Sequence, residues 1–370
     1  MKFDQEMVKE INFYENQTMK QIRVGLIGCG SIAVAHLNGY RQFPELARVV
    51  ALCDVDAATA EKRREEFALD AEYYSDYHMM LDKADLDAVD ICLPIVAHAE
   101  VAIATAKAGK HILIEKPFTN TLAKAKEVVA AADAAGITLM VAHNQRFRRQ
   151  HLKMKQIIEE GKIGRIVSAR AEINQNIKAI LPDGHWHYYH RGALISIGIH
   201  MLDLLRYFVG NVKKVCGFWT TAMMPMVGQE GVVGEEADDL GVAALEFEGG
   251  ALGTLSASYC SKAQWPGSAV FIHGTKGCIH TLGGLHLMSE VDEQYRHLSR
   301  IDVDDEAVSD WRLDPSYVRE IEHFLRCLHE GKEPICSGKD NLLTMAGIEA
   351  IYLSGATGRA IDVNSLLETN

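Results

Sequence analysis

The stretch Arg23-Val24-Gly25-Leu26-Ile27-Gly28-Cys29-Gly30-Ser31-Ile32-Ala33 decides the fold of this chain. Its first half is an apolar run that predicts a buried parallel strand, and its second half is a G-x-G-x-x-A turn that opens a helix. In such a turn Gly28 permits the tight bend and Gly30 lets the backbone approach a pyrophosphate. Ala33 is small enough for the helix and the strand to pack closely. This combination predicts a dinucleotide-binding domain.

The helix that follows the turn supplies the expected phosphate site. Its N-terminus, at Ser31 and Ile32, offers free N–H groups and the positive end of the helix dipole. A second apolar strand, Val49-Val50-Ala51-Leu52-Cys53, ends at Asp54, near the roughly 20-residue spacing expected for a ribose-binding acid. A carboxylate there accepts hydrogen bonds from ribose hydroxyls and repels a 2′-phosphate, so we expect NAD as the cofactor rather than NADP.

Strands alternate with helices through the first 145 residues, as a doubly wound parallel sheet requires. One of these strands, over residues 111–114, runs into Glu115-Lys116-Pro117. A lysine at the carboxyl end of such a strand lies in the crevice where open α/β sheets bind ligands, within reach of both a nicotinamide and a substrate. The sequence therefore predicts an α/β Rossmann domain over residues 21–145, preceded by an N-terminal extension of residues 1–20.

The pattern changes after residue 146 to that of an α+β domain with a largely antiparallel sheet, which we expect to extend to residue 370. The elements expected there are strands over 165–174 and between 212 and about 301, turns at 248–250 and 274–277, and helices over 152–160, 193–209, 315–330 and 341–353. Such a sheet needs helices on one face only. Its other face is free for a partner subunit, so we expect a homo-oligomer, a dimer or tetramer assembled through this sheet.

Composition narrows the class of protein. The chain has 370 residues, 48% of them hydrophobic, and a formal net charge of -12. That charge argues against nucleic acid and against an acidic membrane surface as partners. We find no apolar run of membrane-spanning length and no signal-peptide pattern. The eight cysteines are scattered without a C-x-x-C pair, which favours reduced thiols and a cytoplasmic location.

An ordered set of short motifs resembles the Gfo/Idh/MocA oxidoreductases, the family of glucose-fructose oxidoreductase and inositol dehydrogenase. The motifs are Gly28-Cys29-Gly30-Ser31-Ile32-Ala33, Asp54, Leu93-Pro94 with His98, Ala108-Gly109-Lys110-His111, Glu115-Lys116-Pro117, Asn144-Gln145-Arg146-Phe147 and Gly198-Ile199-His200-Met201-Leu202-Asp203. They extend over nearly the whole chain. The resemblance implies oxidation or reduction of a secondary alcohol on a sugar, glycoside or cyclitol with NAD(P).

The resemblance also implies roles for individual residues in catalysis. His200 is the candidate base for the hydroxyl proton, and Lys116 the group that polarises the reacting oxygen, with a pKa lowered by desolvation. Where the family usually has an aspartate, four residues before this histidine, the chain has Ser196, which cannot take a proton as a carboxylate does. The expected catalytic set is therefore Lys116, Ser196 and His200. The alternatives are a structural core histidine and a solvated surface lysine.

Further residues are expected to hold the cofactor and the substrate. The cofactor set implied by the resemblance is Gly28, Gly30, Ser31, Ile32, Asp54, Leu93, Pro94, His98, Glu115, Lys116 and Asn144. The expected substrate contacts are Arg146, Trp186, His187 and Asp203. For Arg146 the alternative is an ion pair with a buried acid, and for Asp203 it is a partner within the helix packing. Trp186 and His187 belong to an aromatic loop, 183–190, whose composition suits a carbohydrate pocket.

The same loop contains His185, His187 and His190, which leave transition-metal binding as an open alternative. No acid or cysteine completes an obvious ligand set, and hydride transfer needs no metal, so we expect none.

Taken together, these features predict an NAD-dependent sugar or cyclitol dehydrogenase, with the sugar C3 position as the hypothesis that the resemblance suggests. Three alternatives stay open. The first alternative is an NAD-dependent glycoside hydrolase that works by transient oxidation. The second is a cofactor-sensing regulator without turnover. The third is an oxidoreductase whose bound NAD is recycled by a second sugar.

Overall fold

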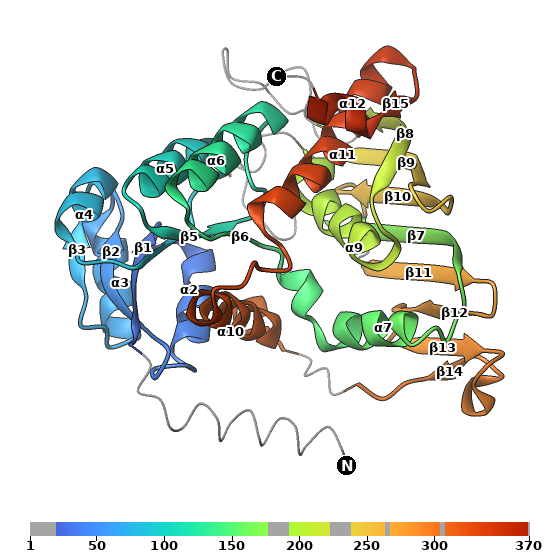
Figure 1. The fold of residues 1–370 in the computed structure, drawn as a ribbon, viewed down its shortest axis with the longest axis horizontal. Coiled ribbons are helices and arrows are strands. Elements are labelled where there is room, and N and C mark those ends of the chain that lie inside the picture. Colours follow the sequence, from blue (N-terminus) through green and yellow to red (C-terminus); the bar gives the residue numbers. More distant parts are fainter. Residues whose placement is uncertain (1–19, 177–191, 223–237, 263–266, 304–307, 369–370) are drawn as a thin grey trace.

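The computed structural model of the protein describes residues 20–176, 192–222, 238–262, 267–303 and 308–368. Two sheets lie side by side, one in each half of the chain (Figure 1).

The first sheet is parallel, with the strand order β3-β2-β1-β4-β5-β6. Its strands are β1 (Ile22–Ile27), β2 (Ala47–Cys53), β3 (Glu72–Tyr74), β4 (Ala88–Ile91), β5 (His111–Glu115) and β6 (Leu139–Ala142). The helices between them are α2 (Ser31–Tyr40), α3 (Ala57–Glu66), α4 (Tyr77–Lys83), α5 (Ile95–Lys107) and α6 (Leu122–Ala135). This order is that of a dinucleotide-binding Rossmann sheet, so the predicted fold of the first half is confirmed.

The second sheet has nine strands in the order β14-β13-β12-β11-β7-β10-β9-β8-β15. They are β7 (Ile166–Asn174), β8 (Val212–Thr220), β9 (Leu240–Phe247), β10 (Leu252–Ser258), β11 (Ser268–Gly274), β12 (Gly277–His280), β13 (His286–Ser289), β14 (Ser299–Arg300) and β15 (Ile361–Asp362). Only β7 and β10 pair in parallel among these described strands, which confirms the prediction of a largely antiparallel sheet.

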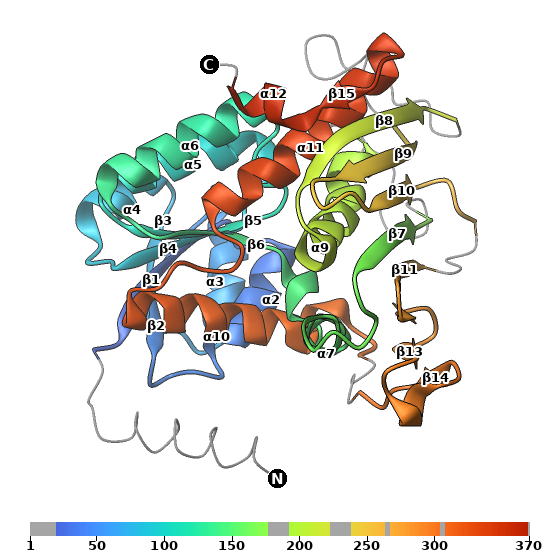
Figure 2. The same ribbon diagram turned by 45° about the vertical axis from the view of Figure 1, so that its right-hand side comes forward.

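Helices α9 (Ile199–Val209) and α11 (Gly338–Thr357) lie against one face of the nine-stranded sheet (Figures 1 and 2). None of the helices that the structure describes covers the opposite face in either view. Phe218, Val242 and Leu252, on three adjacent strands, are 67%, 43% and 62% exposed. This face of the sheet thus exposes the paired Phe218 and Val242, with Leu252 further along it, to solvent.

Helix α10 (Pro315–Glu330) brings the C-terminal part of the chain back to the first domain. Ile321 and Phe324 of α10 are fully buried in the same core as Leu26 of β1. Helix α2 accommodates them through Gly39, where an added Cβ would lie 2.6 Å from Cγ1 of Ile321. The two helices therefore pack closely, as both views show (Figures 1 and 2).

The helix predicted over 193–209 forms, but its first turn, Leu194–Gly198, is a π-helix that continues into α9. Gly198 allows this turn to approach β10, since a Cβ there would lie 2.9 Å from the side chain of Ala257. π-helical turns are rare and concentrate at functional sites. Helix α7 (Arg149–Glu159) and the 3₁₀ turn η1 (Asn144–Phe147) connect the two sheets, and α12 (Val363–Glu368) ends the described chain. None of the helices among the described residues is both long and apolar enough to cross a membrane.

Candidate active site

The glycine-rich turn has the backbone that the sequence requires of it. Gly28 has a φ of +91°, and a Cβ there would lie 2.5 Å from the carbonyl oxygen of Cys92 on the neighbouring strand end. At Gly30, in contrast, an added Cβ would meet no protein atom within 4 Å. Gly30 also caps α2 without any side-chain hydrogen bond to the first N–H groups of the helix. Ser31 and Ile32 begin that helix. The turn thus leaves space and donors for a pyrophosphate.

Asp54 stands at the carboxyl end of β2, beside this turn. Its Oδ2 accepts a hydrogen bond from the N–H of Cys29 at 2.7 Å, and its Oδ1 accepts one from the N–H of Asp56 at 2.9 Å. The carboxylate is therefore held at the edge of the turn and is only partly buried. Together with the open space at Gly30, this placement fits an adenosine ribose and the adjoining phosphates of NAD.

His98 joins two loops at the same edge of the sheet. Its Nε2 lies 2.7 Å from the carbonyl oxygen of Leu93, and its Nδ1 lies 2.9 Å from that of Pro117. Leu93 and Pro94 precede α5, whereas Pro117 follows the Lys116 strand end. The imidazole thus fixes the Leu93-Pro94 loop against the Glu115-Lys116-Pro117 segment, whose Lys116–Pro117 peptide bond is cis. The structure brings these predicted cofactor residues together through a buried side chain.

Lys116 connects the Rossmann sheet to the helix of the second domain. Its Nζ donates a hydrogen bond to the backbone carbonyl of Ser196, at 3.2 Å, in the π-helical turn. Its backbone N–H donates to Oε2 of Glu115 at 2.9 Å. Desolvation lowers the pKa of Lys116, although the charge of the neighbouring Glu115 opposes that shift. The structure therefore brings Lys116 of the first domain against the turn that contains Ser196.

His200, on the first turn of α9, is buried at the same place. Its Nδ1 is enclosed and has no hydrogen-bond partner among the described residues. Burial lowers the pKa of His200 well below its ordinary value, and the neighbouring Lys116 and His143 lower it further. The ring is therefore neutral near pH 7 and can accept a proton. Its surroundings differ from those of a satisfied core histidine, because a ring nitrogen stays unpaired.

His143 is a member of this cluster that the sequence analysis did not single out. Its ring stands edge-on to that of His200, with the ring centroids 6.3 Å apart. Its Nε2 lies 2.5 Å from Nδ2 of Asn341 on α11, so it acts as the acceptor. Burial lowers its pKa as well. The available signal was its position directly after the buried strand β6, where a polar residue faces the ligand edge of a parallel sheet.

Arg146 and Asp203 meet in a buried ion-pair network. Nε and one terminal nitrogen of Arg146 donate to the two carboxylate oxygens of Asp203 at 2.7 and 2.6 Å. The same terminal nitrogen donates to Asp340 at 2.7 Å, and Arg206 donates to the other oxygen of Asp340 at 2.7 Å. These contacts correspond to the alternatives left open for Arg146 and Asp203, in which each finds its partner inside the protein.

Asn144, expected to contact the cofactor, is also engaged within the protein. Its Nδ2 donates to Oγ of Ser316 on α10 at 3.1 Å, and both residues are buried. Trp186 and His187, and with them the histidine-rich loop, lie outside the described residues.

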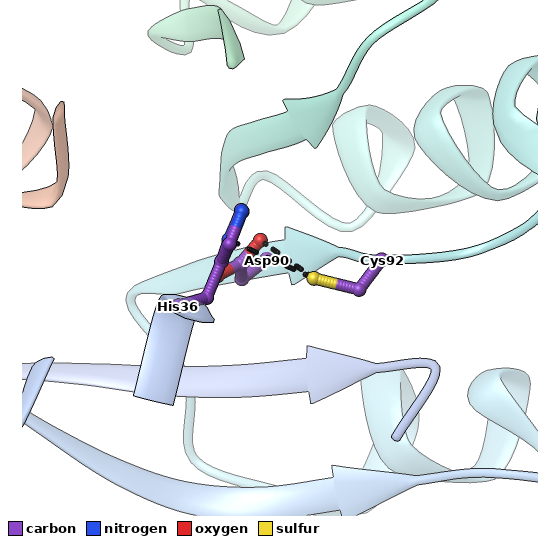
Figure 3. Close-up of side chains that lie close together, drawn as sticks. All are labelled: His36, Asp90 and Cys92. Carbon is purple, nitrogen blue, oxygen red and sulfur yellow. Dashed lines mark hydrogen bonds and ion pairs between the residues drawn. The ribbon is translucent and has the colours of Figure 1, made fainter. Parts of the chain in front are cut away.

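One cluster of potential metal ligands occurs in the part of the chain that the structure describes. His36, Asp90 and Cys92 each place a donor atom within 4.8 Å of the others (Figure 3). Nδ1 of His36 lies 2.8 Å from Oδ2 of Asp90, and its Nε2 lies 3.0 Å from Oε1 of Glu115. Because both ring nitrogens face carboxylates, the imidazole is an ion-pair partner here and has no free nitrogen for a metal ion. Sequence reasoning missed this histidine, although a histidine inside an otherwise apolar helix face was the signal.

Comparison with known proteins agrees with this arrangement. Residues 22–143 match the family described as "Oxidoreductase family, NAD-binding Rossmann fold", and residues 151–280 match the "GFO/IDH/MocA C-terminal domain". The D-apiose dehydrogenase of Paraburkholderia graminis is 29% identical over 359 residues, covering 94% of this chain and 92% of that protein. The levoglucosan dehydrogenase of Pseudarthrobacter phenanthrenivorans is 33% identical over 290 residues, covering 70% of this chain and 73% of that protein.

Among solved structures, a levoglucosan dehydrogenase in complex with NADH and levoglucosan superposes with a TM-score of 0.82 at 26% identity. That match covers 93% of this chain and all of the other. The family consists of NAD(P)-dependent dehydrogenases that act on alcohol groups of sugars and inositols. From its motifs, its two sheets and these matches, the chain belongs to the Gfo/Idh/MocA family of oxidoreductases.

Proposed function

We propose that this protein oxidises a secondary alcohol of a sugar, glycoside or cyclitol, with NAD as the hydride acceptor, His200 as the base and Lys116 as the group that polarises the oxygen. The observation that carries the proposal is the convergence of two desolvated groups at the ligand edge of the Rossmann sheet. The Lys116 amine reaches the turn that leads into His200, and the His200 ring has a buried nitrogen that no described residue pairs with.

Each group suits its part of the reaction. A neutral imidazole takes the hydroxyl proton, and a protonated amine stabilises the negative charge that develops on the oxygen. When bound, NAD supplies the acceptor for the hydride from the carbinol carbon. Burial, and then the charge of Lys116, lowers the pKa of His200, so this ring starts in the neutral form that a base needs. Ser196 contributes its backbone carbonyl, which accepts the hydrogen bond that holds the lysine.

The cofactor preference follows from Asp54. Its carboxylate stands at the end of β2 next to the Gly28–Gly30 turn, held by two backbone N–H groups. A negative charge in that position favours ribose hydroxyls and repels a 2′-phosphate. The relatives solved with NAD⁺ or NADH support the same preference.

The substrate class is inferred from the relatives, which include dehydrogenases named for apiose, levoglucosan and myo-inositol. All are polyhydroxylated, uncharged molecules. We propose a compound of this kind, with oxidation at a sugar C3 as the hypothesis to test first. Trp186 and His187 are proposed to contact it. The ion-pair network of Arg146 and Asp203 favours a supporting role for those two residues beneath the site.

We also propose a homo-oligomer formed through the uncovered face of the nine-stranded sheet. The exposed pair of Phe218 and Val242, with Leu252 further along the same face, supports this assembly, because exposed apolar side chains that gather on one face mark interaction surfaces. Light scattering of Phe218→Glu/Leu252→Glu should give a smaller particle than the wild-type protein. An unchanged mass would exclude this face as the interface.

The activity is tested by following NADH absorbance with purified protein, NAD and a panel of sugars, glycosides and cyclitols. His200→Ala and Lys116→Ala should each lower kcat by about 100-fold or more, as expected for removal of an acid–base group. Lys124→Ala, an exposed lysine paired with Glu127, is the matched control and should keep full activity.

The alternatives predict different results in the same assay. NAD binding without any NADH signal would contradict the proposed dehydrogenase. Release of free sugar from a glycoside without net NADH would then favour a hydrolase. Formation of ketosugar without NADH would favour a cofactor recycled by a second sugar. Binding with no chemical change in any compound would favour a cofactor sensor.

A further inference from the structure

The His36 side chain of α2 is buried directly beneath the Lys116 strand end. It is fully enclosed and lies between two carboxylates from adjacent strands, Asp90 of β4 and Glu115 of β5. The contacts are short at both ring nitrogens, 2.8 Å from Nδ1 to Asp90 and 3.0 Å from Nε2 to Glu115. Figure 3 shows the ring directed at Asp90, with Cys92 on the same side.

This geometry fits a ring that carries a proton on each nitrogen. A neutral imidazole has one N–H and would turn a lone pair toward the second acid. A doubly protonated ring instead donates a hydrogen bond to Asp90 and another to Glu115.

Glu115 links the His36 ring to Lys116. One carboxylate oxygen of Glu115 faces His36, and the other accepts the backbone N–H of Lys116 at 2.9 Å. One oxygen of the Glu115 carboxylate is thus held by the His36 ring, and the other by the Lys116 N–H. The amine of Lys116 in turn donates to the backbone carbonyl of Ser196, a residue that lies 80 positions further along the sequence.

We propose that His36 is a positioning residue, an imidazolium that fixes the Glu115 carboxylate and thereby the placement of Lys116 in the active site. The proposal rests on the function proposed above for Lys116.

The other groups around His36 are consistent with a charged ring. Cys92 lies 3.6 Å from Nδ1, and its thiol is neutral because burial raises its pKa. Tyr317 of α10 has its ring centroid 6.1 Å from that of His36. Glu320 of α10 is buried, and neither of its oxygens has a partner in the described part of the chain; burial together with the charge of Glu115 raises its pKa well above the ordinary value. Glu320 is then protonated and does not compete for the imidazolium.

The pKa of Tyr40, on the same helix as His36, is also raised well above its ordinary value, by burial and by the charge of Asp90, so this phenol stays neutral. For His36, burial lowers the pKa, but the charge of Asp90 and the hydrogen bonds of the ring together raise it well above the ordinary value.

The charge state is tested on the intact protein with ¹⁵N-labelled histidine, by NMR correlation of ring nitrogens and protons. His36 is assigned by the signals missing from His36→Gln. Two protonated ring nitrogens at pH 8 are the expected result. His151, which is buried against a single carbonyl, provides the contrast and should show a neutral ring. A neutral His36 at pH 8 would overturn the proposal.

The positioning role is tested by kinetics of His36→Gln, Glu115→Gln and the double variant. Since a misplacement of about 1 Å costs about 100-fold in rate, we expect kcat to fall by about 10- to 100-fold in His36→Gln while its NAD affinity is retained. The double variant should be no slower than the slower single variant, because both act through one path. His151→Gln is the control and should keep the wild-type kcat. Multiplied losses in the double variant, or a parallel loss of NAD binding in His36→Gln, would contradict the proposed role.

A readout independent of turnover separates this proposal from the proposed function. In a crystal structure of His36→Gln, Nζ of Lys116 should leave its hydrogen bond to the Ser196 carbonyl. An unmoved amine would overturn the positioning role even in an active enzyme. A displaced amine in a protein that oxidises no polyol would instead support the positioning role and refute the proposed function. If His36→Gln does not fold, Asp90→Asn replaces it in both experiments.

Discussion

Replacing Asp203 by leucine should destabilise the protein strongly, because it leaves the Arg146 guanidinium buried without its main partner. In the folded protein Asp203 accepts two hydrogen bonds from Arg146, at 2.6 and 2.7 Å, and its side chain is completely enclosed. After the substitution the acceptors that the described residues still offer the guanidinium are Asp340 and the carbonyl of Ile335. Breaking a buried ion pair from one side costs about 3–5 kcal/mol.

Two further variants test whether the burial of the ion pair causes the large loss of stability in Asp203→Leu. Asp340 also pairs with Arg146, but its side chain is 30% exposed, so Asp340→Ala should cost less, about 1–2 kcal/mol. The double variant Arg146→Met/Asp203→Leu removes both charges and fills similar volume. It should therefore be more stable than Asp203→Leu alone, by about 2 kcal/mol or more.

The assay is the free energy of unfolding from urea titration at pH 7, followed by tryptophan fluorescence. Burial raises the pKa of Asp203, but the Arg146 charge outweighs it and lowers the pKa. The contribution of the pair is therefore complete above the ordinary carboxyl pKa, about 3.9, and is lost as pH falls through the lowered value. A loss below about 1 kcal/mol for Asp203→Leu, typical of an exposed pair, would refute the reasoning. So would a double variant that is less stable than the single one.

Four other predictions concern the cofactor site and the histidines. Asp54→Ala should weaken NAD binding by about 10- to 100-fold through lost charge-assisted hydrogen bonds, and should reduce the preference for NAD over NADP. An unchanged ratio of kcat/KM for the two cofactors would contradict the assignment of Asp54 as the ribose-binding acid. Gly28→Ala should lower the unfolding temperature, because the new Cβ meets the Cys92 carbonyl and the residue has a positive φ. Gly30→Ala should leave the unfolding temperature unchanged and weaken NAD binding only. Equal unfolding temperatures of the two variants in calorimetry would contradict this difference. Burial lowers the pKa of His151 to about 4, so protonation of this histidine opposes folding, and stability should fall by at most about 3 kcal/mol as pH drops from 6.5 to 4. His151→Gln should flatten the stability profile in this window, and an unaltered slope would disprove the link. Because the pKa of His200 is lowered, the acid limb of kcat/KM should lie below pH 6.5, and a limb at or above that value would show a solvated base.

Much of the first domain was predictable because its signals are local. The positive φ at Gly28, the buried run of β1 and the acid at the end of β2 are each determined within a few residues of chain. The same holds for the turns 248–250 and 274–277, which join β9 to β10 and β11 to β12 as predicted. The π-helical first turn before α9 was not predictable, since it depends on the close approach of Gly198 to Ala257, a residue on a distant strand.

The sequence alone therefore determined the Rossmann sheet and the cofactor turn, because periodicity and spacing encode local structure. The resemblance of its motifs to the family indicated Lys116 and His200 as candidate groups. Only the tertiary structure decided which side chains meet. Lys116 donates to the Ser196 carbonyl, 80 residues along the chain. His36 contacts Glu115, 79 residues along the chain. Arg146 forms its ion pair with Asp203. Such pairs follow from how α2, α9 and α10 pack on the sheets. Packing of that kind depends on the complementary shapes of distant side chains, which leave no periodic trace in the sequence.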